Sequence, residues 1–110
     1  VVSGVITNAM DAMPSRVRAW IGPCIGPCHY EVGREIQEAY ERAHGSQAGV
    51  FSQEGTSLRM DLPAAAALQL ESSGADVMNS DPLCTYCDAR FFSHRRDGGR
   101  TGRQAVIVYR

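Results

Sequence analysis

The stretch RVRAWIGPCIGPC, residues 16–28, decides the fold class because a strand pattern runs directly into a shaped loop. Apolar residues alternate along RVRAWI, which is the period-two pattern of a half-buried β-strand. Two Gly-Pro pairs follow, and a proline with fixed φ beside a glycine gives a loop of defined shape. We therefore expect a strand over 16–21 and a rigid loop over 22–28.

Outward from this stretch, helical and strand patterns alternate, which predicts an α/β fold. Apolar residues near helical spacing predict a helix before Pro14, and a second helix over 31–43 has one apolar side. Asp61 is expected to cap an alanine-rich helix that Gly74 ends. Polar loops are expected at 45–57, where Val50 and Phe51 are the anchors, and at 79–90. Short strands are expected at 58–61, 75–78 and 104–109.

Length and composition indicate one soluble globular domain. The chain has 110 residues, of which 44% are hydrophobic and 21% charged, values that exclude intrinsic disorder. Its apolar runs all fall short of the roughly 20 residues that a membrane-spanning helix needs. The net charge of −1 argues against a protein that coats nucleic acid.

The charge is nonetheless uneven along the chain. All eleven basic residues are arginines, and six of them lie in residues 90–110 beside a single acidic residue, Asp97. Arginine recognises anions with a planar, forked set of donors. Three glycines in FFSHRRDGGRTGR (91–103) allow a tight turn with exposed N–H groups, which favours anions. We expect Arg95 or Arg96 to bind an anionic group and the other to pair with an acid; a solvated face that balances an acidic body is the alternative.

Four cysteines, at positions 24, 28, 84 and 87, have the spacing CxxxC and CxxC. Four thiolates can form a tetrahedral zinc site, and His29 can replace one of them. The CTYC pair fits a zinc knuckle better than the first pair does, because Pro27 stiffens the first spacer. The alternative is four small thiols that are packed without a metal, and disulfides are disfavoured because nothing indicates secretion.

Two of the three histidines lie in segments of interest. His29 follows Cys28 in the rigid loop, and His94 precedes two arginines, whereas His44 is placed near a helix end. A Cys-His pair can act as nucleophile and base once a fold brings its members together. A structural role for each histidine remains the alternative.

Three blocks of sequence carry a resemblance to a known family. They are AWIGPCIGPCHYEVG (19–33), MDLPAAAALQLESSGA (60–75) and CTYCDARFFSHRRDGGRTGRQA (84–105). Their order and spacing resemble the C-terminal half of the YfiH-like laccase-domain family, first described as multicopper polyphenol oxidases and now regarded as purine nucleoside phosphorylases. The resemblance covers nearly the whole chain and implies one incomplete domain, residues 1–110, with mixed sheets in α/β/β/α layers.

The resemblance implies a cytoplasmic enzyme that cleaves adenosine, inosine and methylthioadenosine with phosphate and that also deaminates adenosine. Its partners are purine nucleosides and phosphate, with no nucleic acid and no membrane. The family's zinc, sometimes described as copper, is held by histidines and a cysteine that we expect upstream, so no residue of this sequence is assigned as a catalytic metal ligand. This chain alone is then expected to be inactive.

The resemblance and the residue chemistry together assign the site. Cys28 and His29 are the catalytic candidates, and the substrate-binding candidates are Tyr30, Phe91, Phe92, His94, Arg95 and Arg96. Family members commonly have cysteine at position 29 and tyrosine at position 94, where this chain has histidines. Two other functions remain open: a cysteine-type amidase of the same fold that acts on a cell-wall precursor, and a zinc-stapled module that binds nucleic acid.

Overall fold

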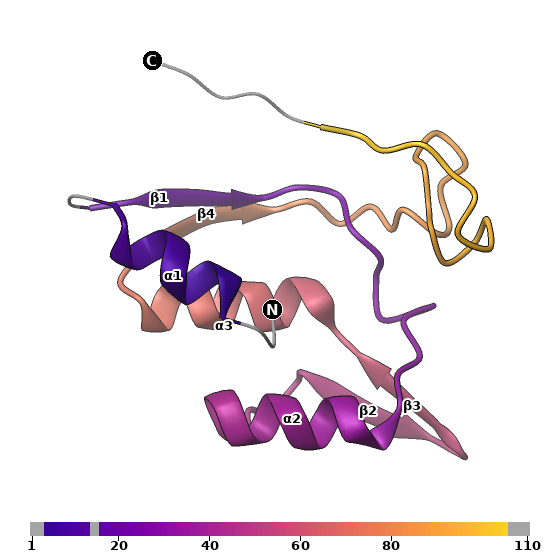
Figure 1. The fold of residues 1–110 in the computed structure, drawn as a ribbon, viewed down its shortest axis with the longest axis horizontal. Coiled ribbons are helices and arrows are strands. Elements are labelled where there is room, and N and C mark those ends of the chain that lie inside the picture. Colours follow the sequence, from indigo (N-terminus) through magenta and orange to yellow (C-terminus); the bar gives the residue numbers. More distant parts are fainter. Residues whose placement is uncertain (1–3, 14–15, 106–110) are drawn as a thin grey trace.

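The computed structural model describes residues 4–13 and 16–105, in which helices alternate with short strands. None of the helices in these two ranges is long and apolar enough to span a membrane. The expected α/β class, with sheets packed against helices, is confirmed. In chain order the elements are α1 (Val5–Asp11), β1 (Arg18–Ile21), α2 (Arg34–His44), β2 (Phe51–Glu54), β3 (Ser57–Met60), α3 (Leu62–Ser72) and β4 (Asp76–Ser80) (Figure 1).

Two small sheets organise the chain, one parallel and one antiparallel. β1 and β4 pair in parallel, with a register shift between Ala19 and Trp20. β2 and β3 form an antiparallel hairpin in which Glu54 pairs with Ser57. Helix α3 contacts β1, β4 and α1, and Figure 1 shows α1 and α3 below the parallel sheet, with α2 and the hairpin below them. The chain that connects the two paired strands β1 and β4 therefore includes α2, the hairpin and α3.

The core lies where α2, the hairpin and α3 meet. Tyr40, Val50, Met60 and Ala65 form one buried cluster, and Tyr40 is fully buried. The Tyr40 hydroxyl donates a 2.7 Å hydrogen bond to Gln47 Oε1, which satisfies the polar end of this buried ring. The prediction that Val50 anchors the segment after α2 is confirmed.

Local signals in the sequence set the ends of the helices. The Asp61 side chain accepts a 3.0 Å hydrogen bond from the Ala64 N–H and caps α3 as predicted. Gly74, at φ 92°, follows the end of α3 in the left-handed region that favours glycine. Helix α2 begins three residues later than predicted, because Glu31 forms an antiparallel bridge with Arg59 and is held in extended backbone.

Two predictions about the strands need correction. The segment 45–57, expected to be a loop, contains β2, because a two-residue turn at Gly55 and Thr56 allows residues 51–54 to pair with β3. The strand expected at 104–109 is not formed at Gln104 and Ala105, and residues 106–110 lie outside the described part of the chain.

Candidate functional site

The candidate site is built from two loops that leave the same edge of the parallel sheet. The first, the GPC loop (residues 22–33), follows β1, and the second, the CTYC loop (residues 81–104), follows β4. Since parallel strands point the same way, their carboxyl ends meet at one edge, and such edges commonly carry ligand sites. Cys24 and Cys84 form a parallel bridge there, and the Thr85 N–H donates a 3.0 Å hydrogen bond to the Cys24 carbonyl oxygen. Figure 1 shows the two loops side by side beyond the sheet.

Three cysteines and one histidine gather where the two loops meet. We call Cys28, His29, Cys84 and Cys87 the Cys3His cluster; their ligand atoms all lie within 4.8 Å of one another. Cys28 Sγ lies 3.4 Å from Cys87 Sγ, and His29 Nδ1 lies 3.3 Å and 3.2 Å from these two sulfur atoms. Cys24 is not a member, so of the two tetrads considered from the sequence, the one that includes His29 is assembled.

The thiols of the cluster differ in acidity. Desolvation, followed by hydrogen bonding to Cys87 and Cys84, raises the pKa of Cys28 to about 12. Desolvation also opposes ionisation of Cys84, but backbone N–H groups, that of Gly26 first, outweigh it and lower the pKa of Cys84 to about 6. Backbone hydrogen bonds thus favour the thiolate of Cys84, whereas desolvation disfavours the thiolate of Cys28.

A pocket of aromatic and cationic side chains lies beside this cluster. Its volume is about 270 Å³, and it is lined by Tyr30, Phe92, His94 and Arg95, with Ile25, Thr85 and Ser93. Arg95 lies over the Tyr30 ring, with Cζ 5.2 Å from the ring centroid, which is cation–π geometry. Arg95 also donates a 2.8 Å hydrogen bond from Nη1 to the Glu31 carbonyl oxygen, so its guanidinium is oriented while the residue stays exposed.

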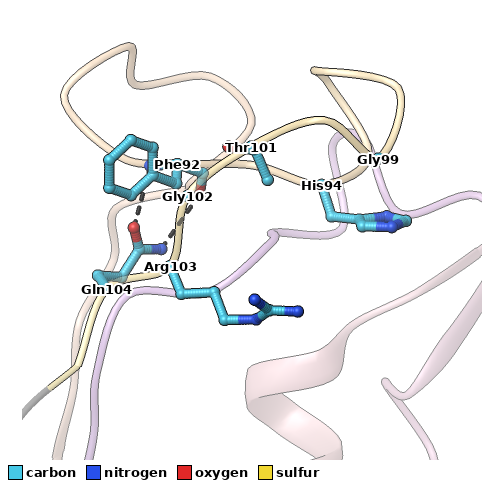
Figure 2. A pocket seen from close by; sticks show the side chains of 7 residues that line it. All are labelled: Phe92, His94, Gly99, Thr101, Gly102, Arg103 and Gln104. Atoms are coloured by element: carbon cyan, nitrogen blue, oxygen red, sulfur yellow. Dashed lines mark hydrogen bonds between the residues drawn. The ribbon is translucent and has the colours of Figure 1, made fainter.

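A second pocket adjoins the first through Phe92 and His94. It has a volume of about 300 Å³, and residues of the segment 99–104 complete its wall (Figure 2). The Gln104 amide holds Phe92 by accepting a 3.0 Å hydrogen bond from its N–H and donating a 3.1 Å bond to its carbonyl oxygen. Gln104 was not among the predicted site residues, and nothing in the sequence distinguishes it from other polar loop residues.

Arg96 is directed into the CTYC loop rather than into the pocket. Its Nη1 donates to the carbonyl oxygens of Thr85 (3.0 Å), Tyr86 (3.2 Å) and Asp88 (3.3 Å), and its Nη2 donates to that of Phe91 at 2.7 Å. Its Nε donates a 3.1 Å hydrogen bond within an ion pair to the Asp97 carboxylate, and this bonding lowers the pKa of Asp97. The guanidinium therefore ties four backbone carbonyl groups of the CTYC loop together.

The structure brings most of the predicted site residues together at one edge. Cys28 and His29 lie in contact, and four of the six substrate-binding candidates line one pocket. Phe91 and Arg96 do not line that pocket. Binding of substrate by any of these residues remains a prediction. Besides Gln104, the pocket-lining residues that the sequence analysis did not assign include Ile25, Thr85, Ser93 and Thr101, all of which lie inside the quoted motifs without a feature that marks them.

Comparison with known proteins gives one consistent family. A family model described as multi-copper polyphenol oxidoreductase laccase matches residues 1–110. The purine nucleoside phosphorylase YfiH of Escherichia coli (strain K12) is 35% identical over 111 residues, covering 97% of this chain and 45% of the relative. A purine nucleoside phosphorylase of Xylella fastidiosa (strain 9a5c) is 36% identical, covering 98% of this chain and 43% of the relative. The chain thus spans about half the length of these relatives.

Solved structures agree with the sequence comparison. A Neisseria meningitidis protein superposes with a TM-score of 0.78 at 30% identity, covering 89% of this chain and 43% of that chain. The Bacillus licheniformis hypothetical protein YfiH gives a TM-score of 0.68 at 34% identity, covering 77% of this chain and 34% of that chain. Since the family model covers the chain from end to end and the fold agrees, this protein belongs to the multi-copper polyphenol oxidoreductase laccase family.

Proposed function

We propose that residues 1–110 form one wall of the substrate site of a purine nucleoside phosphorylase, an enzyme of the cytoplasm. The observation that carries the proposal is the pocket in which Tyr30, Phe92, His94 and Arg95 converge. The names of the relatives at about 35% identity support the same reaction. Phosphorolysis transfers the sugar from the base to phosphate through a C1′ centre that becomes cationic, so the site must orient an anion and a ring.

Arg95 is the residue that we propose to bind phosphate. Its one hydrogen bond within the described ranges is to the Glu31 carbonyl oxygen, which leaves most of its five guanidinium donors for a ligand. Charge-assisted bonds of this kind are about twice as strong as neutral ones. Arg96 does not fill this role, because its donors are already bound to backbone carbonyls and to Asp97.

Phe92 is the ring that we propose to stack on the purine. The face of Tyr30 is covered by the Arg95 guanidinium, whereas Phe92 is 51% exposed and lines both adjoining pockets. Its backbone is held on both sides by Gln104, so the ring is presented from a fixed position. His94 borders the same two pockets and is placed to hydrogen-bond the base or the sugar.

The zinc or copper that the family implies for catalysis does not fit the residues described. Catalytic zinc sites commonly have three protein ligands and an open position, and copper sites are rich in imidazole. The Cys3His cluster instead offers three thiols and a single imidazole, a closed set of four donors. We therefore propose that residues outside 1–110 hold the catalytic metal, and no step of the reaction is assigned to the Cys3His cluster.

The residue chemistry weighs against the two other functions. A cysteine-type amidase requires a thiolate nucleophile, with Cys28 or an upstream cysteine in that role, and desolvation raises the pKa of Cys28. A nucleic-acid-binding tail requires free cations, and ion pairs with Asp88 and Asp97 already engage two of the arginines, Arg90 and Arg96. Both observations favour the proposed role of the CTYC loop as part of the wall of the substrate pocket.

Product analysis tests the proposed reaction. The complete reading frame that contains residues 1–110 should release free base from inosine, adenosine or methylthioadenosine only when phosphate is present, with a sugar phosphate as second product. Conversion of adenosine to inosine without phosphate measures the proposed deaminase activity separately. Residues 1–110 expressed alone should release no base. Base release that is equally fast without phosphate would show hydrolysis and contradict the proposal.

A further inference from the structure

We propose that Cys28, His29, Cys84 and Cys87 bind one Zn²⁺ in a closed tetrahedral site that joins the GPC loop to the CTYC loop. This site is separate from the substrate pocket and from the catalytic metal of the proposed function. Its role is structural, since four protein donors leave no open position for water or substrate. The inference stands on the arrangement of the donor atoms, on the loops that hold them and on the charges around them.

The spacing of the donor atoms matches a zinc tetrahedron. With Zn–S at about 2.3 Å and Zn–N at about 2.0–2.1 Å, ligand atoms in a tetrahedral site stand roughly 3.5–3.8 Å apart. Cys28 Sγ, Cys87 Sγ and His29 Nδ1 are separated by 3.2–3.4 Å, and all four donor atoms lie within 4.8 Å. Movements of about 1 Å or less, within the reach of side-chain rotation, therefore complete the coordination geometry.

Both loops are held in place by contacts that do not involve the metal. The Gly26 N–H donates a 3.1 Å hydrogen bond to Cys84 Sγ, and the Asp88 N–H donates a 3.0 Å bond to the Cys84 carbonyl oxygen. A Cβ atom at Gly26 would lie 3.3 Å from Cys84 Cβ, so the absence of a side chain permits this close approach. A hydrogen bond to a ligand atom, such as that from the Gly26 N–H to Cys84 Sγ, fixes the orientation of that atom before the ion binds.

The imidazole of His29 is oriented in the same way. Its ring stacks on Tyr86, with centroids 4.1 Å apart and an interplanar angle of 12°. This stacking turns Nδ1 toward the sulfur atoms of Cys28 and Cys87. Tyr86 lies between the two cysteines of the CTYC motif, so one loop supplies both the thiols and the surface that positions the histidine of the other loop.

Charge around the cluster suits a thiolate-rich centre. On binding, the thiols of the cluster that are still protonated lose their protons to solvent and three Zn–S bonds form, while neutral His29 donates its Nδ1 lone pair; the centre then carries a charge of about −1. Arg59 and Arg95 line the pocket on the His29 side of the cluster, together with Glu31. Asp88 lines a different pocket, together with the three cysteines of the cluster, and is paired with Arg90.

Metal content and thiol protection test the site. The 110-residue chain, purified under reducing conditions and loaded with Zn²⁺, should retain one zinc ion per chain after gel filtration. Cys87→Ser should weaken zinc binding on the order of 100- to 1,000-fold in competition with a chromogenic chelator. The matched control is Cys24→Ser, which removes the cysteine of the GPC loop that lies outside the cluster and should bind zinc like the wild type.

A measurement on the unaltered chain keeps the test valid if Cys87→Ser fails to fold. Zinc should protect Cys28, Cys84 and Cys87, but not Cys24, from alkylation, and removal of zinc should expose all three together. Co²⁺ should give the ligand-field spectrum of a tetrahedral, thiolate-bound ion. The proposal is wrong if the chain retains no zinc, if Cys24→Ser loses zinc as Cys87→Ser does, or if Cys28 and Cys87 form a disulfide that leaves zinc content unchanged.

Discussion

Replacement of Arg96 by glutamine should destabilise the CTYC loop more than any other single change among its arginines. The guanidinium donates to four backbone carbonyl oxygens at 2.7–3.3 Å and pairs with Asp97, and the side chain is only 27% exposed. Hydrogen bonds to a charged group contribute about 1.5–3 kcal/mol each, but bonds that share one group are not additive, and water can solvate part of the vacated carbonyls. We expect a loss of roughly 2–4 kcal/mol in the free energy of unfolding.

Thermal unfolding followed by circular dichroism measures this loss. For a chain of this size the expected fall in Tm is roughly 10–20 °C. Arg95→Gln is the matched control, because Arg95 makes one hydrogen bond to a carbonyl oxygen and is exposed; it should cost less than about 1 kcal/mol. Arg96→Lys should also destabilise, since one ammonium group cannot reach four carbonyls. If Arg96→Gln and Arg95→Gln unfold within about 2 °C of each other, Arg96 does not hold the loop.

Three further outcomes follow from single contacts. Asp61→Ala should lower the free energy of unfolding by about 1 kcal/mol through loss of the α3 cap, whereas Asp61→Asn, which keeps an acceptor, should cost only a few tenths in urea unfolding. Tyr40→Phe should cost about 1 kcal/mol in the same assay, because Gln47 loses its buried donor. By NMR the Asp88 carboxyl should titrate with a pKa of about 2 rather than 3.8, because Arg90 hydrogen-bonds it. The contribution of this ion pair to stability is complete above pH 3.8 and is lost as the pH falls through about 2. Arg90→Gln should return the pKa of Asp88 toward 3.8.

Features with short-range causes could be predicted from the sequence. Alternation along residues 16–21 predicted the strand that is observed as β1, and the Asp61 cap depends on a hydrogen bond only three residues away. The hairpin strand β2 was missed because three of its four residues, Ser52–Glu54, are polar and exposed, so that its pairing depends on the turn at Gly55 and Thr56 rather than on an apolar pattern.

The composition of the candidate site could be predicted only in part. Spacing named the cysteines and His29 as candidate ligands, but which of Cys24 and His29 joins the cluster depends on the turn at residues 27–29. Likewise, the sequence does not distinguish Arg95 from Arg96, since adjacent side chains of equal charge acquire different roles from their tertiary partners. Such choices arise from contacts between loops some 60 residues apart, which no local pattern encodes.

The KM for phosphate of an Arg95→Ala variant shows whether Arg95 binds the phosphate substrate. In the complete protein, with saturating inosine, loss of the charge-assisted contact should raise this KM by roughly ten- to more than a hundredfold, because such contacts contribute about 1.5–3 kcal/mol. Arg90→Ala is the control, since Arg90 is paired with Asp88 and does not line the substrate pocket; its KM should stay within about twofold of wild type. An Arg95→Ala enzyme that keeps the wild-type KM for phosphate would contradict the assignment of this pocket as the phosphate site.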